Sequence, residues 1–303
     1  MFSLRLLCVF VVLFLGFQVL ESQNQQLDIK ISNDKFVFQD KYYTSGLHIS
    51  YRKYLKNKFL FKQQKSQRLQ LNILVGNETY TPSNLSSFNT NDFDRPYAGW
   101  LFVGVELAKI KFKSALFLSV ESGITGEESL AGKLQNAFHE LLNIEKPTWQ
   151  DEIAYKWLFN FKIKQVYDIP LGNSTSIQNH SSVSVGSKDI YLKNSLFLFF
   201  GKFNTLQNSS RLNALSSVSK KEFFGFIGGS YKYVALNTLI QGSPFNDSDA
   251  FTSIAEKNIY SLQAGSVLRT RRNIFKLEYI YNSKETPLST SHIFGAFTFG
   301  FVF

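Results

Sequence analysis

One histidine lies where the sequence predicts a helix. From Glu128 to Asn143 the apolar residues recur at the three- and four-residue spacing of a helix, and Ser129 or Thr125 is available to cap its start. His139 follows Gln135 by four residues, so both side chains leave the helix on one face. Histidine titrates close to neutral pH, which makes His139 a candidate for moving a proton. A packing or surface histidine on an amphipathic helix is an equally good interpretation.

A second group of candidates lies at the end of a predicted strand. Asn33 and Asp34 are adjacent there, and Thr44 follows at the start of the next predicted strand. Carboxylate and amide oxygens are the hard ligands that Ca²⁺ takes in proteins. The alternative is structural, because an Asn-Asp pair is also common in turns.

The segment 94–100 is the densest short motif and reads Asp-Arg-Pro-Tyr-Ala-Gly-Trp. Arg95 could pair with Asp94 or with a phosphate, while Pro96 and Gly99 would shape the chain where it enters a strand. A structured corner with a tryptophan at the membrane interface is the alternative interpretation.

Around these candidates, bulky apolar residues alternate with polar or small ones, which predicts strands with one apolar face. In the last stretch, 293–303, Phe297, Phe299 and Phe301 share one face. A soluble protein rarely leaves such an edge unpaired, whereas in an outer-membrane barrel the last strand pairs with the first. The segments with this pattern are 27–34, 42–53, 68–75, 101–107, 113–122, 155–163, 182–190, 192–203, 222–236, 260–268, 275–281 and 293–303.

About twelve strands predict an all-β, antiparallel transmembrane β-barrel, with the short helix in an extracellular loop. A soluble β-sandwich also alternates, but it seldom keeps bulky aromatic residues on its exposed side. Alternation places His48 on the lumen side of its strand, while His180 and His292 are expected in or beside polar loops. Three connections rich in Asn, Ser and Lys are expected to be extracellular loops or turns: 55–67, 204–221 and 241–255.

The N-terminus predicts export to the bacterial outer membrane. Arg5 precedes an apolar run that ends at Leu15, too short for a membrane-spanning helix, so 1–22 is predicted to be a signal peptide and 23–303 the barrel. The only cysteine, Cys8, lies in that leader, so the mature chain cannot rely on disulfides. The net charge of +10 favours a phosphate-bearing lipid surface over nucleic acid for such a barrel.

Taken in order, these motifs resemble the lipid A 3-O-deacylase family of outer-membrane barrels. The resemblance covers roughly the N-terminal half of the mature chain, and the C-terminal half resembles the family only as barrel strands. It rests on Asn33-Asp34, 42–47, 94–100, Gly123, Gly126, Gln135-Asn136, His139 and 147–151.

The resemblance implies a Ca²⁺-dependent esterase that hydrolyses the 3-O-linked acyl or acyloxyacyl chain of lipid A. His139 would be the general base that activates water. Asn33, Asp34, Thr44 and Gln135 would line the same site.

The resemblance also implies a metal and a substrate surface. Asp34 would hold Ca²⁺, which would stabilise the oxyanion of the reacting ester, and Asn33 and Glu145 are further implied ligands. Lys133, Lys146 and Arg95 are candidates to meet lipid A phosphates.

Two other functions stay open. A phospholipase acting on glycerophospholipid esters could use the same chemistry. A non-catalytic porin or structural barrel would keep His139 and Asp34 as scaffold only.

Overall fold

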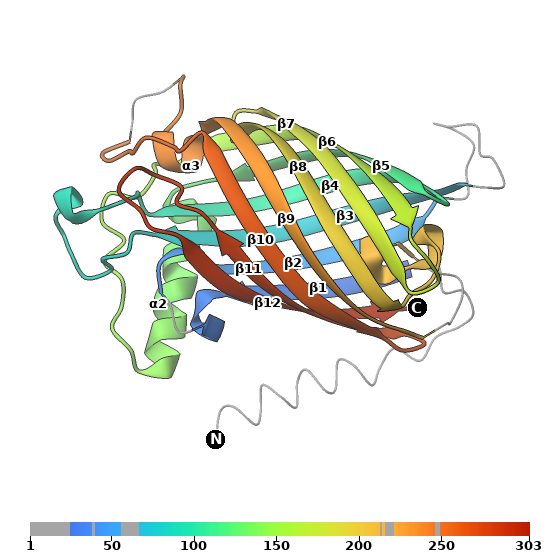
Figure 1. Cartoon of the computed structure of the whole chain (residues 1–303). Coiled ribbons are helices and arrows are strands. Elements are labelled where there is room, and N and C mark those ends of the chain that lie inside the picture. Colours follow the sequence, from blue (N-terminus) through green and yellow to red (C-terminus); the bar gives the residue numbers. More distant parts are fainter. Residues whose placement is uncertain (1–24, 38–39, 56–66, 213, 216–220, 246–248) are drawn as a thin grey trace.

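The computed structural model describes residues 25–37, 40–55, 67–212, 214–215, 221–245 and 249–303, and these form a closed antiparallel barrel (Figure 1). The predicted signal peptide, 1–22, lies outside the described residues. Each of the twelve strands pairs with its neighbours in sequence, and β1 pairs with β12. The strands are β1 Gln25–Asn33, β2 Tyr42–Tyr54, β3 Gln67–Thr81, β4 Ala98–Lys111, β5 Ser114–Ile124, β6 Trp157–Pro170, β7 Thr175–Gly186, β8 Asp189–Lys202, β9 Glu222–Asn237, β10 Asn258–Arg269, β11 Asn273–Asn282 and β12 His292–Val302.

Short helices lie in the connections. The described helices are η1 Asp34–Val37, η2 Thr90–Asp92, η3 Glu127–Ser129, α2 Ala131–Leu142, η4 Leu206–Asn208, η5 Ser210–Leu212 and α3 Thr238–Gln241. Within the described part of the chain, none of these helices has the length and hydropathy needed to cross a bilayer.

The predicted alternation sets the two faces of the wall. On β4, Trp100 and Phe102 point inward and are buried, while Val103 is 52% exposed on the outside. The same holds for β2, where Thr44 and Arg52 are buried and Leu47 and Ile49 are exposed. A period of two therefore gives a lipid-facing surface and a packed interior.

The last strand closes the barrel as its pattern predicted. Its pairing with β1 runs from Gln26 opposite Val302 to Asn33 opposite Gly295. Gly300 is required here, because a Cβ at this position would collide with the Asp28 carboxylate. The terminal stretch therefore has a partner on both sides and no free edge.

The lumen contains paired charges and apolar clusters. Arg52 pairs with Asp28, and Arg211 lies 2.9 Å from Asp168. Towards one end, Leu206 and Leu212 pack against inward residues of β4 and β5. Paired charges in a low-dielectric interior keep each other ionised and hold the packing in place.

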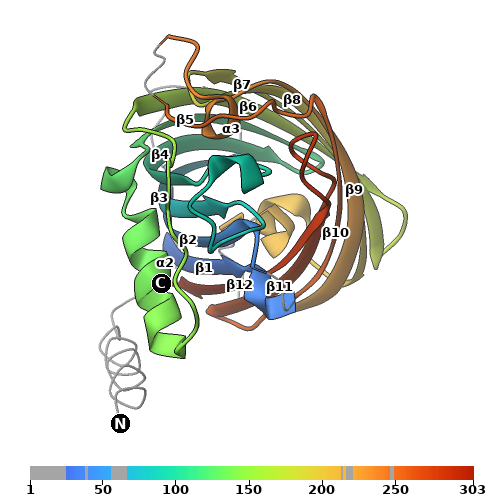
Figure 2. The ribbon, with the colours of Figure 1, turned by 90° about the vertical axis from the view of Figure 1, so that its left-hand side faces the viewer.

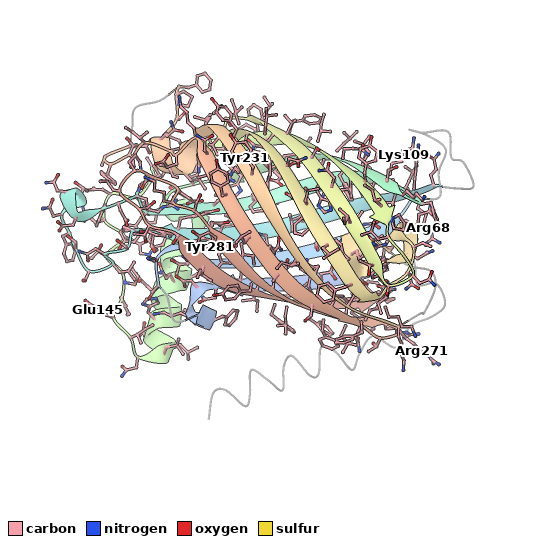
Figure 3. All side chains as sticks on the ribbon, viewed as in Figure 1. Arg68, Lys109, Glu145, Tyr231, Arg271 and Tyr281 are labelled. Atoms are coloured by element: carbon pink, nitrogen blue, oxygen red, sulfur yellow. The ribbon has the colours of Figure 1, made fainter. Side chains whose placement is uncertain are left out.

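The two ends of the barrel differ. Figure 1 shows η1, α2 and α3 at one end and the C-terminus at the other. Figure 3 places Glu145 at the α2 end and the cationic residues Arg68, Lys109 and Arg271 at the opposite end.

Three expectations about the connections were wrong or incomplete. The segment 204–221, between β8 and β9, lies at the end of the barrel where β1 begins and β12 ends, whereas 241–255 lies at the α2 end. Most of 55–67 lies outside the described residues. The strand expected at 182–190 is split by the turn between β7 and β8. His180 consequently lies within β7, not in a loop, and its ring packs 5.0 Å from that of Phe197.

Candidate active site

Helix α2 lies outside the barrel wall, against β3 and β4 (Figure 2). As predicted, Gln135 and His139 share one face, and both are buried together with Ala131. The helix begins later than expected, at Ala131, and its N-cap is Leu130, with a φ of 62° and no side-chain cap. Ser129 is one residue too early for that position, although its hydroxyl accepts a long hydrogen bond from the Ala131 amide.

Small residues bring the start of the helix close to the barrel. Gly99 on β4 has no room for a Cβ, which would meet the Ser129 hydroxyl and lie 2.6 Å from the Ala131 Cβ. Asn77 on β3 donates a 2.7 Å hydrogen bond to the Ser129 carbonyl. The wall therefore fixes where the helix starts, and with it the position of every residue on the buried face.

The His139 ring is held in one tautomer. Only 2% of this residue is exposed, and its Nδ1 lies 2.5 Å from the Glu145 carbonyl oxygen. A carbonyl can only accept, so Nδ1 donates, and in the neutral imidazole Nε2 is the nitrogen with the lone pair. Nε2 faces the Asp40 carboxylate at 3.6 Å.

Two carboxylates of one short connection, Asp34 and Asp40, interact electrostatically, and Asp40 faces the imidazole. Asp34, at the start of η1, is fully buried; its Oδ2 accepts from the Lys41 amide at 2.7 Å, and its Oδ1 has no hydrogen-bond partner among the described residues. Asp40 Oδ2 pairs with the Lys35 ammonium at 2.7 Å, and its Oδ1 also lacks a partner. Burial, with the nearby Asp40 charge, raises the pKa of Asp34 to about 8. Two unsatisfied buried carboxylate oxygens are what a bound cation would satisfy.

The amide of Gln135 continues the buried face. Its Oε1 accepts a 2.9 Å hydrogen bond from the Trp149 indole, and its buried Nε2 has no hydrogen-bond partner in the described part of the chain. The Trp149 ring lies against Gly132 of the helix and 5.1 Å from the Tyr97 ring. Gln135 therefore has a fixed orientation and one free donor.

The remaining predicted site residues have mainly backbone roles. The Asn33 side chain accepts from the Lys35 amide at 2.6 Å and shapes the turn into η1. Thr44 is buried, with its hydroxyl 2.8 Å from that of Thr81. The Glu145 carboxylate is exposed in the segment after α2 (Figure 3), and its carbonyl is the part that meets His139.

Asp40 thus lies 3.6 Å from His139 and close enough to Asp34 to raise its pKa, and Gln135 shares the buried helix face with His139. No contact ties Thr44 to the imidazole directly. Asp40 was not identified from the sequence, although it is the second acid in the same short connection as Asp34. Among the described residues, no three His, Cys, Asp or Glu side chains form a ready metal site; a cation would be held by Asp34, Asp40 and neighbouring oxygens.

The segment 94–100 is a structural corner. Asp94 accepts from the Tyr42 hydroxyl at 2.7 Å, and Arg95 pairs with Glu285 at 2.8 Å, not with Asp94. Arg95 is buried over the Tyr80 ring, so it cannot meet a lipid phosphate. Trp100 points into the barrel and not to the membrane interface, because β4 places its even-numbered residues inward.

Comparisons with known proteins identify the family and the fold. The chain matches the family model described as outer membrane protein LpxR over residues 4–303. LpxR from Salmonella typhimurium has a similar structure, with a TM-score of 0.76 and 18% identity over 92% of this chain and 100% of that chain. The β domain of the Bordetella autotransporter BrkA is a more distant barrel, with a TM-score of 0.51 and 11% identity over 92% of this chain and 99% of that one.

No curated protein sequence matches the chain. At these identities the solved structures show the fold, while the family model spans nearly the whole length and confirms the family that the motifs indicated. The chain belongs to the LpxR family of outer membrane proteins.

Proposed function

We propose that this barrel is a lipid A deacylase that hydrolyses the 3-O-linked acyl or acyloxyacyl chain, with water activated by His139 and with Ca²⁺ as cofactor. The observation that carries the proposal is the buried His139 ring, whose Nδ1 donates to a carbonyl and whose Nε2 faces the Asp40 carboxylate. Family membership and the position of α2 at the lipid-facing wall support lipid A as the substrate.

In the proposed reaction, His139 Nε2 takes a proton from water as the water oxygen attacks the ester carbonyl. The imidazolium that forms is stabilised by the Asp40 carboxylate at 3.6 Å, while the Glu145 carbonyl keeps the ring in place. When the tetrahedral intermediate collapses, the sugar oxygen leaves and takes the proton back from Nε2. The products are a free fatty acid and a sugar hydroxyl.

The unpaired groups near His139 suit the developing charge. Gln135 Nε2, a buried donor without a protein partner, is free to donate to a substrate oxygen. When bound by Asp34 and Asp40, Ca²⁺ would supply Lewis-acid stabilisation of the oxyanion. Asn33 and the Glu145 side chain are the nearest additional oxygen donors implied by the family, but Glu145 would have to turn inward to serve.

A phospholipase is the second candidate, because the same groups could cleave a glycerophospholipid ester. The non-catalytic porin is the weaker alternative. A scaffold has no need for two unsatisfied carboxylate oxygens beside a histidine of fixed tautomer.

The direct test is hydrolysis by the purified barrel in detergent, with lipid A as substrate and either Ca²⁺ or a chelator present. We expect loss of one acyl unit by mass spectrometry only with Ca²⁺. The rate should fall about 100- to 10,000-fold for His139→Asn, the usual contribution of a general base. Glu140→Gln is the matched control, because that neighbouring side chain is exposed.

Full activity of folded His139→Asn would disprove the mechanism. Phospholipid cleavage with lipid A untouched would favour the phospholipase. Inactivity of a folded wild-type barrel on both lipids would favour the non-catalytic barrel.

A further inference from the structure

Helix α2 has three distinct faces. One faces the barrel and carries Ala131, Gln135 and His139. A polar face carries Lys133 and Glu140, each in an exposed ion pair. Between them lies an exposed apolar face formed by Leu130, Leu134, Phe138, Leu141 and Leu142.

The angular order of these faces is fixed by the helix. Successive residues are separated by about 100°, so the apolar face lies roughly at a right angle to the barrel-facing side and away from Lys133 and Glu140. Leu134 is 53% exposed and Leu141 is 75% exposed. In a water-soluble helix this surface would be packed against a core, and here no described residue covers it.

The orientation of α2 relative to the barrel axis is that of a helix lying in the membrane interface. In Figures 1 and 2 the axis of α2 runs across the barrel axis and not along it. A bilayer surrounds a barrel with its plane perpendicular to the barrel axis, so α2 lies roughly parallel to the membrane plane. Amphipathic helices in this orientation bury their apolar face about 5–10 Å into the headgroup and acyl boundary.

The apolar face also continues an existing lipid-facing surface. Helix α2 contacts β3 and β4, and the outward residues of these strands include exposed Val75 and Val103. The wall and the helix therefore present one apolar region on the outside of the barrel. Its chemistry matches the acyl chains of the outer leaflet.

We propose that α2 is an interfacial helix: the face formed by Leu130, Leu134, Phe138, Leu141 and Leu142 is immersed in the acyl chains of the outer leaflet. Helix α2 is then held between the bilayer and the barrel wall. This places His139 at the depth in the membrane where the ester bonds of lipid A lie. This second consequence rests on the proposed deacylase function, whereas the immersion itself does not.

Fluorescence from single cysteines tests the immersion independently of catalysis. The sequence has only Cys8, in the predicted leader, so Leu141→Cys and Glu140→Cys can each carry one environment-sensitive dye. The host is a phosphatidylcholine nanodisc containing lipid A. We expect a blue-shifted dye at 141, quenched several-fold more strongly by nitroxide on lipid acyl chains than the dye at 140.

Equal quenching of both dyes by a water-soluble quencher would overturn the proposal. Protection of 141 that depends on protein concentration, with cross-linking between chains, would also overturn it and assign the face to a second copy.

Hydrolysis assays test the second part of the proposal, that immersion of α2 positions His139. Leu141→Asn replaces an exposed apolar group by a polar one of similar size. We expect several-fold slower hydrolysis of lipid A in nanodiscs, but an unchanged rate on lipid A dispersed in detergent, with Glu140→Gln as control. Equal loss in both settings would contradict a role in the leaflet. An inactive wild-type protein in both nanodiscs and detergent would refute the proposed function. The fluorescence result would still test the immersion of α2.

Discussion

At the scale of single residues, the site is defined by buried polar atoms that lack hydrogen-bond partners. Among the described residues, Asp34 and Asp40 each present one buried oxygen without a hydrogen-bond partner, and His139 directs Nε2 at the Asp40 carboxylate. Such groups are costly to bury unless something else completes them. A cation and a polarised substrate would complete them together.

The raised pKa of Asp34 gives a pH dependence for Ca²⁺ binding. A cation binds the ionised carboxylate, and burial holds the pKa at about 8, so below that pH the proton must leave first. The apparent affinity should therefore rise by up to about tenfold per pH unit below 8 and level off above it. Calorimetric Ca²⁺ titration over a pH series would show this slope.

Asp34→Asn should weaken Ca²⁺ binding strongly and remove most of the slope. Asp92→Asn, at an exposed acid elsewhere in the chain, should change neither. A wild-type affinity that stays flat with pH would exclude Asp34 as the ligand.

At the scale of elements, activity depends on how closely α2 approaches the wall. Gly99→Ala places a Cβ against the Ser129 hydroxyl and the Ala131 Cβ, so the start of the helix must move. A displacement near 1 Å at a site costs about 100-fold in rate. We expect that loss in the lipid A assay, while the barrel still migrates as folded on an unheated gel.

Gly229→Ala is the matched control, because its added Cβ would be 3.6 Å from Leu262, an ordinary contact. Comparable losses in both variants would mean that a general effect on the barrel, and not the helix position, explains the result.

At the scale of the whole molecule, side chains that meet inside the lumen argue against an open, porin-like channel. Lys162 pairs with Glu121 at 2.5 Å and Lys188 with Asp189 at 3.0 Å, and Leu206 and Leu212 pack inside near one end. In planar bilayers we expect no steady open-channel current from the purified protein. A stable conductance of the size of an open porin, unaffected by His139→Asn, would contradict this.

The sequence predicted the barrel well because its signal is repeated. Alternation in each strand identified the inward and outward faces, as at Thr44 and Leu47. Where a connection is only a few residues long, as between β7 and β8, alternation runs through it, and the boundary and the place of His180 were wrong.

The candidate site was less predictable because its members come from separate connections. The helical spacing placed Gln135 and His139 on one face, but it could not show that the Glu145 carbonyl fixes the imidazole. The Asp94-Arg95 pair looked like a binding motif until the fold brought Glu285 to Arg95. Neighbours in sequence were not partners in space.

The sequence by itself determined the strand pattern, the export prediction, the family resemblance and the shared face of Gln135 and His139. These follow from local periodicity and short motifs, which need no long-range contact. Only the tertiary structure decided that Asp40 faces His139, that Arg95 is enclosed, and that the apolar side of α2 is left uncovered. The reason is physical: barrel closure and the seating of α2 bring distant loops together, and burial then decides which polar groups remain without partners.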